Sequence, residues 1–313
     1  MKKILILGGA GYIGTVLSNF LLSKKFKVTV IDNFWFGNFL QKKIKKIKKD
    51  IRSLNEKDFK NQDIVINLAY LSNDPLCEVN ARDTWETGPL STYQQLDFSL
   101  KSGVKKYIFA SSGSIYGIKQ EKKVTEELGL DPITDYNKSK MICEKVIESF
   151  DKKISTAILR PATVSGFSPR LRLDVVLNLF CYQAFFEKKI TILGGNQIRP
   201  LVHIKDMVRS YEFVINKKLK GCFNVGFENL KVKDIANLVK RQIPCKINIK
   251  KSNDPRSYRM NSDKLLNHGF KPKHTLNDAI NDIKINFEKG FKPTKKNWNL
   301  KWLLEKKVIS KSG

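Results

Sequence analysis

The sequence lacks most of what disulfide-rich, metal-binding and membrane proteins require. Its five cysteines are far apart and form no CxxC pair, which indicates reduced thiols rather than a disulfide framework or a zinc site. Only three histidines occur, so no metal site is expected. No segment approaches the roughly 18–20 apolar residues that cross a bilayer, and the short apolar start has no cleavage site behind it. We therefore expect a cytoplasmic globular protein with no membrane contact.

Acidic residues are also scarce, with 30 against 58 basic ones and a net charge of +28. Only 10 of the basic residues are arginines, the type that makes bidentate contacts with phosphates and bases. The lysines are spread along the chain, and the densest run, at 42–49, contains no aromatic residue. The pattern favours a solvated lysine surface, which attracts anionic substrates, over a specific nucleic-acid site. A nucleic-acid binder stays as an alternative, tested by salt-sensitive retention on DNA.

Short apolar runs alternate with helical patterns in the first half of the chain, which is typical of βαβ units and a parallel sheet. Strands are predicted at 3–7, 27–31, 44–48, 63–67, 107–110 and 155–159, and helices at 12–23, 83–101 and 135–149. The second half is less regular, with helices predicted at 174–187, 232–242 and 276–287 and strands at 191–193, 201–204 and 222–225.

This order of elements predicts an α/β protein: a Rossmann-type doubly wound parallel sheet with a smaller, partly interleaved α/β substrate-binding domain. We expect the first domain at 1–165 and the second mainly at 166–290, with segments that return to the first. A tail follows at 291–313. Its residues Trp298, Trp302, Leu303 and Leu304 are expected to pack on this chain or on a second copy.

A glycine turn connects the first predicted strand to the first predicted helix. Gly8, Gly11 and Gly14 are spaced so that backbone amides at the helix N-terminus can approach a pyrophosphate. Asp32 ends the second strand, where its carboxylate would accept both ribose hydroxyls and repel a 2′-phosphate. The pattern predicts NAD rather than NADP. The alternative is a glycine turn that only packs the helix on the sheet.

The glycine spacing, with several later motifs, resembles the extended short-chain dehydrogenases, the NAD-dependent nucleotide-sugar epimerase and dehydratase family. The matching stretches are Asp50-Ile51, Asn67-Leu68-Ala69, the SSGSIYG run at 111–117, the YxxxK motif at 136–140, LRPAT at 159–163 and RPLVHIKD at 199–206. The resemblance implies an NAD site made of Gly8, Gly11, Tyr12, Ile13, Gly14, Asp32, Asn33, Asp50, Ile51, Leu68, Ala69, Tyr136, Lys140 and Pro161.

The resemblance also implies a catalytic group made of Ser112, Tyr136 and Lys140. Tyr136 and Lys140 are four residues apart and share one face of a helix. A nearby ammonium and the positive nicotinamide both favour the phenolate, so a lowered pKa of Tyr136 is expected. Tyr136 would then take the proton of a sugar hydroxyl, Lys140 would hold the nicotinamide ribose, and Ser112 would bond the same sugar oxygen.

Two small residues narrow the expected reaction. Dehydratases of the family carry Asp-Glu where this chain has Gly113 and Ser114, and decarboxylating relatives place Glu at the second position. We therefore expect a nucleotide-sugar 4-epimerase that resembles UDP-glucose 4-epimerase and serves surface-polysaccharide synthesis. A nucleotide-sugar 4-dehydrogenase or 4-ketoreductase is the first alternative, and a non-catalytic dinucleotide sensor is the second.

The residues that bind the substrate have weaker sequence signals than those of the cofactor site. Candidate contacts are Ser112, Ser114, Thr163, Arg172, Arg199 and Arg256, with Arg170 as a further basic residue for a diphosphate. Gly88, Thr163 and Lys251 depart from the pattern of the better-known epimerases, so the sugar and the base are left open. By analogy with the family we expect a homodimer that forms through the helices at 83–101 and 135–149.

Overall fold

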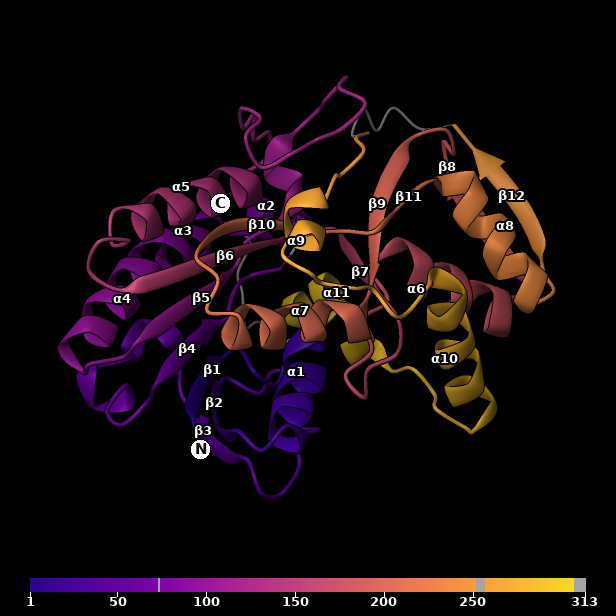
Figure 1. Ribbon diagram of the computed structural model, residues 1–313. Helices are drawn as coiled ribbons and strands as arrows, with labels where there is room; N and C mark the ends of the chain where they lie inside the picture. The colour runs from indigo at the N-terminus through magenta and orange to yellow at the C-terminus, as the bar shows by residue number, and fades with distance from the viewer. Residues whose placement is uncertain (73, 252–256, 307–313) are drawn as a thin grey trace.

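The computed structural model describes residues 1–72, 74–251 and 257–306 (Figure 1). In this part of the chain the centre is a seven-stranded parallel sheet with the order β10-β6-β5-β4-β1-β2-β3. Its strands are β1 (Lys3–Leu7), β2 (Lys27–Asp32), β3 (Lys45–Lys48), β4 (Ile64–Asn67), β5 (Lys106–Ala110), β6 (Ser155–Pro161) and β10 (Gly221–Val225). The predicted Rossmann-type sheet is confirmed.

Both faces of this sheet are buried, which explains why its strands are continuous apolar runs. Ile4 and Ile6 of β1 pack in the same cluster as Leu17 of α1 (Tyr12–Ser23). Leu5 and Leu7 point the other way, into a cluster that contains residues of α4 (Ser91–Lys101) and α5 (Asp135–Glu148). The alternation of side chains along β1 therefore supplies two helix layers (Figure 1).

A second, smaller region lies beside the sheet (Figure 1). Three strands form one small sheet, β7 (Thr163–Ser165), β9 (Ile198–His203) and β11 (Glu228–Lys231), and two form another, β8 (Lys189–Leu193) and β12 (Lys246–Lys250). Helices α6 (Val176–Tyr182), α8 (Val232–Gln242) and α10 (Leu276–Glu288) pack around them. Between these elements the chain returns once to the large sheet as β10, which pairs with β6.

The segment predicted as one helix at 83–101 is helical throughout, but a π-helical turn divides it. The segment contains α3 (Ala81–Trp85), a π-helical turn (Glu86–Leu90) and α4. Pro89 lies inside the π-helical turn, where it has no amide hydrogen to give to an α-helical ladder. The predicted helix at 174–187 is interrupted in the same way, since α6 ends at Tyr182 and a π-helical turn (Gln183–Glu187) continues it.

Several elements were not predicted. The strand expected at 201–204 ends at His203, because Ile204 begins the unpredicted helix α7 (Ile204–Asn216). Three short helices were also missed, besides β7, β11 and β12, as were several single turns of 3-10 helix. The helices are α2 (Asp74–Val79), α9 (Asp263–Asn267) and α11 (Asn299–Glu305). The described part of the tail belongs to the fold, since Leu303 of α11 packs in one buried cluster with Leu71 and Cys77.

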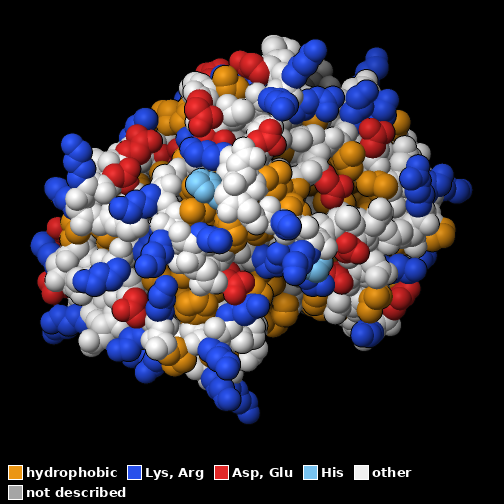
Figure 2. All heavy atoms as spheres, viewed as in Figure 1, with side chains coloured by type: hydrophobic (Ala, Val, Ile, Leu, Met, Phe, Trp, Pro, Cys, Tyr) orange, Lys and Arg blue, Asp and Glu red, His pale blue; other side chains and the backbone are white. Residues whose placement is uncertain are grey.

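The lysine run at 42–49 includes β3, the last strand at one edge of the large sheet. Lysines on an edge strand oppose pairing with another chain. On the face shown in Figure 2, Lys and Arg side chains are scattered rather than gathered in one patch. Within the described residues no helix is long and apolar enough to be a membrane span.

Candidate functional site

A pocket of about 570 Å³ lies at the carboxyl ends of the strands in the large sheet and reaches into the smaller region. Every predicted site residue that the structure describes lines it: Gly8, Gly11, Tyr12, Ile13, Gly14, Asp32, Asn33, Asp50, Ile51, Leu68, Ala69, Ser112, Ser114, Tyr136, Lys140, Pro161, Thr163, Arg172 and Arg199. Arg256 lies outside the described residues. A crevice at this end of a parallel sheet is where doubly wound folds bind ligands.

The glycine turn is shaped for close backbone approach. Gly8 has a φ of +76°, and a Cβ there would lie 2.6 Å from the backbone nitrogen of Ala69. A Cβ on Gly14 would lie 2.4 Å from the carbonyl oxygen of Gly8, so neither position accepts a side chain. Gly11 is the N-cap of α1 and has no side chain to bond the first amides of the helix. These amides are therefore open to an anionic group, which fits the pyrophosphate of a dinucleotide.

Asp32 is held at the end of β2 by two backbone donors. Its Oδ2 accepts from the amide of Ala10 at 2.9 Å and its Oδ1 from the amide of Phe34 at 2.7 Å. Burial raises the pKa of the Asp32 carboxyl, and these two hydrogen bonds oppose the rise. The carboxylate is thus fixed beside the glycine turn, where a ribose diol would meet it.

A second acid, Asp50, lies after β3 in the same half of the pocket. Arg52 makes two hydrogen bonds to its carboxylate, at 3.0 and 2.9 Å, and Asn33 donates to it at 3.2 Å. Burial raises the pKa of Asp50, but these donors outweigh burial and the pKa lies below its usual value. Asp50 is therefore an ionised acceptor at neutral pH.

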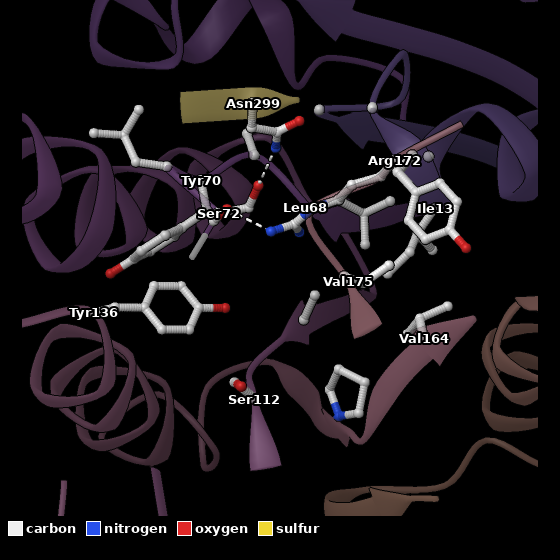
Figure 3. Close-up of a pocket in the computed structure, with 18 of the residues that line it drawn as sticks. Ile13, Leu68, Tyr70, Ser72, Ser112, Tyr136, Val164, Arg172, Val175 and Asn299 are labelled. Carbon is white, nitrogen blue, oxygen red and sulfur yellow. Dashed lines mark hydrogen bonds between the residues drawn. The ribbon is translucent and has the colours of Figure 1, made fainter. Parts of the chain in front are cut away.

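The proposed catalytic residues come from two neighbouring elements. Tyr136 lies in the first turn of α5, which Thr134 caps, and Ser112 follows β5. The Ser112 Oγ lies 2.7 Å from the Ser114 Oγ, and Ser114 donates onward to the Asn137 Oδ1 at 2.6 Å. Figure 3 shows the Tyr136 hydroxyl pointing into the pocket on the side where Ser112 lies.

Lys140 lies one turn after Tyr136 and is only 3% exposed. Its Nζ donates to the carbonyl oxygen of Ala110 at 2.7 Å and lies 3.7 Å from the ring centre of Tyr70. Burial lowers the pKa of the Lys140 ammonium to about 8. Since the carbonyl and the ring face hold the ammonium, its position in the pocket is fixed before any ligand binds.

The expected lowering of the Tyr136 pKa is not what the protein's own groups produce. Burial raises the pKa of Tyr136 above its usual value, and Cys77 and Asp74 raise it further, against smaller opposing effects of Arg172 and Ser112. The Lys140 Nζ lies 5.9 Å from the ring centre of Tyr136 and is directed at Ala110 and Tyr70. Any activation of the phenol therefore needs the charge of the bound cofactor.

Sequence reasoning missed Tyr70, which contacts both Tyr136 and Lys140. Its hydroxyl is 2.5 Å from the Ser139 Oγ, and its ring meets Tyr136 edge-on with centres 5.7 Å apart. A Cβ on Gly88 would lie 2.4 Å from the Tyr70 Oη. The unusual glycine at 88 was a usable signal, because the space it leaves is the space that Tyr70 fills.

At Gly113, too, neighbouring side chains fill the space that a larger residue would need. A Cβ there would lie 2.3 Å from the Met260 Cε and 2.8 Å from the Tyr258 Oη. Met260 and Tyr258 therefore occupy the place of a side chain at 113. Two carboxylates of the pocket come from other segments: Asp74 accepts from Thr134 at 2.6 Å, and Asp174 pairs with Arg172 at 2.7 Å.

The arginines take different places along the pocket. Arg172 donates to the Asp174 carboxylate and, at 2.9 Å, to the carbonyl oxygen of Ser72. Ser72 in turn accepts from Asn299 at 3.0 Å, so a chain of hydrogen bonds crosses the pocket (Figure 3). Arg199 lies beside Tyr258, at the end that the smaller region supplies. Asn299 comes from α11 and was not predicted as a site residue.

Comparisons with known proteins agree with this geometry. The profile of the NAD dependent epimerase/dehydratase family matches residues 4–226, which is well over half of the chain. A UDP-glucose 4-epimerase of Lactobacillus helveticus is 28% identical over 316 residues, which cover 89% of this chain and 94% of that protein.

Two solved structures have the same fold. The UDP-glucuronic acid 4-epimerase of Bacillus cereus, in complex with UDP-glucuronic acid and NAD, is 25% identical, has a TM-score of 0.82 and is matched over 92% of this chain and 100% of its own. The UDP-N-acetylglucosamine 4-epimerase of Methanobrevibacter ruminantium has a TM-score of 0.86 at 21% identity, with 93% and 99% covered. The chain thus belongs to the NAD dependent epimerase/dehydratase family of extended short-chain dehydrogenases and is an NAD-dependent enzyme of nucleotide sugars.

Proposed function

We propose that the protein is a nucleotide-sugar 4-epimerase. The observation that carries this proposal is the filling of the space at Gly113 by Met260 and Tyr258. A carboxylate that would eliminate water from the neighbouring carbon has no room at that position. At Ser114 the side chain is a hydroxyl that is bonded to Ser112 and Asn137. The side chains at 112 and 114 therefore carry hydroxyl groups, suited to moving one proton at one carbon, and Ser112 lies within reach of Tyr136.

Each side chain has a role that follows from its position. Bound NAD supplies the acceptor and the donor of a hydride. Tyr136 takes the proton of the sugar hydroxyl and later returns it, and Ser112 bonds the same oxygen. Lys140, held by Ala110 and Tyr70, presents its ammonium to the ribose end of the site. The glycine turn, Asp32 and Asp50 hold the rest of the dinucleotide.

The substrate is a nucleotide sugar whose diphosphate meets basic side chains. Arg199 is the strongest candidate, because it lines the pocket next to Tyr258, away from the glycine turn. Ser112, Ser114 and Thr163 line the part of the pocket where the sugar would lie. Arg172 lies nearer the cofactor half, since it contacts Ser72 and influences the pKa of both Tyr12 and Tyr136.

The test is an assay of purified protein with UDP- and GDP-hexoses, read by chromatographic separation of the sugar epimers, by the masses of the products and by absorbance at the NADH wavelength. The expected result is interconversion of 4-epimers of equal mass with no net production of NADH. Tyr136→Phe is expected to lower the rate by about 100-fold or more while NAD stays bound. Loss of water or carbon dioxide from the sugar would contradict the proposal.

Two other outcomes correspond to named alternatives. Stoichiometric NADH with an oxidised sugar would show a 4-dehydrogenase, or a 4-ketoreductase when run in reverse. Full retention of every activity in Tyr136→Phe would support a dinucleotide sensor instead. We further propose a cytoplasmic role in surface-polysaccharide synthesis, which the accumulation of the matching sugar nucleotide in a deletion strain would test.

A homodimer through α3, α4 and α5 is part of the proposal. Trp85, Leu90 and Tyr93 are exposed apolar side chains on or between α3 and α4. A second copy of the chain would cover them. Sedimentation of the wild type should give twice the mass of one chain, and Leu90→Asp should lower it to one. A monomeric wild type would contradict this part.

A further inference from the structure

Arg170 is a buried cation that forms no ion pair with any of the described residues. It is 3% exposed, yet no carboxylate among the described residues lies within ion-pair distance of it. It donates to the carbonyl oxygen of Leu171 at 3.4 Å and to the side-chain oxygen of Asn299. Its Nε has no hydrogen-bond partner at all. A buried guanidinium of this kind is costly unless an anion binds to it.

The place of Arg170 indicates which anion this is. Arg170 lines the pocket, and its guanidinium lies over the ring of Phe36, 3.9 Å from the ring centre. Its backbone amide bonds Ser168, which donates at 3.1 Å to the carbonyl oxygen of Tyr12, the first residue of α1. The positive end of α1 and the guanidinium therefore face one part of the pocket, next to the end of β2.

We propose that Arg170 binds the diphosphate of the dinucleotide and that helix α11 holds Arg170 there, so that the C-terminal helix closes the cofactor site. A planar guanidinium with a free Nε can give two parallel hydrogen bonds to phosphate oxygens. The amides at the start of α1 would bind the same group from the other side. Burial and the neighbouring Arg172 lower the pKa of Arg170 to about 9, and a bound anion would reverse that effect.

Helix α11 is tied to three segments that line the pocket. Asn299 accepts from Arg170 and donates to Ser72, which follows β4. The indole Nε1 of Trp302 donates at 2.8 Å to the carbonyl oxygen of Trp35, in the loop after β2. These contacts join the loops after β2 and β4 to the segment of Arg170. Release of the dinucleotide would require at least one of these contacts to open.

This inference deepens the proposed function, because an epimerase has to keep its cofactor while the sugar is turned over. It does not depend on which reaction is catalysed, since its readout is the loss of NAD and not turnover. A failed epimerase assay would leave it standing, and unchanged NAD retention would overturn it while the epimerase proposal stands.

The experiment measures the rate at which holoprotein loses isotopically labelled NAD into an excess of unlabelled NAD. Arg170→Leu is expected to release NAD between about tenfold and one-hundredfold faster, as for the loss of a hydrogen bond to a charged group. Arg170→Lys keeps the positive charge but lacks the planar guanidinium, so its rate of NAD release should lie between those of the wild type and Arg170→Leu. Asn299→Ala should release NAD faster than the wild type. Arg241→Leu removes an exposed arginine of α8 and should behave as the wild type.

A second measurement separates a diphosphate contact from a general loosening of the pocket. Saturating NAD and saturating adenosine each raise the thermal midpoint of a protein that binds them. Arg170→Leu, or Arg170→Lys if the first variant does not fold, should lose much of the shift with NAD and keep the shift with adenosine. The proposal is overturned if release is as slow as in the wild type, or if both shifts fall together.

Discussion

Substitution of Gly88 by alanine should weaken the fold, against the usual expectation for a glycine in a helical segment. Such a change ordinarily stabilises a helix by about 0.5–1 kcal/mol. Here the added Cβ would lie 2.4 Å from the Tyr70 Oη, and 3.1 and 3.2 Å from two ring carbons. The Tyr70 hydroxyl is held by Ser139 and its ring by Lys140 and Tyr136. The tyrosine therefore has no easy way to move aside.

The size of the effect follows from these contacts. Overpacking of a filled space costs about 1–3 kcal/mol, and loss of the bond to Ser139 adds about 1 kcal/mol. After the helix-stabilising effect of alanine is subtracted, the net loss in free energy of unfolding should be about 1–3 kcal/mol. Chemical unfolding, followed by circular dichroism on the protein with saturating NAD, would measure it. Gly129→Ala is the control, because a Cβ there meets nothing within 4 Å.

A double variant makes the explanation refutable. Tyr70→Phe removes the atom nearest to the new methyl group and leaves the two ring contacts above 3 Å. Gly88→Ala in a Tyr70→Phe background should therefore cost less than in the wild type, with a coupling energy of about 1 kcal/mol. If Gly88→Ala is as stable as the wild type, or if the Phe background gives no relief, the account of Gly88 and Tyr70 is incorrect.

Two further predictions concern stability. Burial lowers the pKa of His203 to about 4, with smaller contributions from His274 and Lys205 and opposing effects of Asp282 and Asp206. As pH falls below about 6.5, the unfolded chain therefore binds a proton at this histidine that the folded chain does not bind. Between pH 7 and pH 4 the free energy of unfolding of the wild type should fall by roughly 3 kcal/mol more than that of His203→Asn, a variant whose Asn side chain can still cap α7. An equal dependence of the unfolding free energy on pH in the two proteins would contradict this prediction. Glu144→Leu should lower the free energy of unfolding by about 3–5 kcal/mol, because it leaves the buried Arg160 guanidinium without its ion-pair partner. In the wild type this guanidinium lies 2.6 Å from the Glu144 carboxylate, and both side chains are buried. Glu148→Leu, which breaks an exposed pair with Lys145, is the control and should cost below about 1 kcal/mol in urea unfolding.

The parts of the fold that were predicted correctly have strong local signals. The strands of the large sheet are apolar runs because both of their faces are buried, and periodicity finds such runs easily. Gly8, Gly14 and Asp32 have backbone roles that allow few other residues, so their spacing, together with the predicted strands and helix around them, indicated the cofactor half of the pocket. The predicted and observed bounds of α1 and α8 agree for a similar reason, since each has a clear apolar face.

The missed elements were missed for different reasons. The amphipathic pattern of α7, with Ile204, Met207, Val208 and Tyr211 on one face, was present in the sequence but was overlooked beside the motif before it. The break at Pro89 was also legible, but a π-helical turn can carry a helical pattern through a proline.

Arg170 was named as a candidate for a diphosphate but its partner Asn299 was not, and Tyr70 was signalled only by the unusual glycine at 88. Each is placed by a partner far away in the chain: Tyr70 by Gly88 and Lys140, and Arg170 by Asn299. Such pairs are set by tertiary packing, which a periodicity does not encode. The sign of the pKa shift at Tyr136 failed for the same reason, because it depends on how deeply the ring is buried and on where the Lys140 ammonium points.

The contact of Asn299 with Ser72 and Arg170 has a consequence for synthesis on the ribosome. The first half of the chain emerges early and can form βαβ units before the rest exists, since domains tend to fold from the N-terminus. The sheet, however, gains its last strand only with Gly221–Val225, and the pocket gains its closing helix only with Asn299–Glu305. A nascent chain that has not reached Asn299 carries the glycine turn but lacks the helix that we propose closes the site. The order of translation thus separates Pro161, the last residue of the NAD site on the large sheet, from this helix by more than 130 residues of further synthesis.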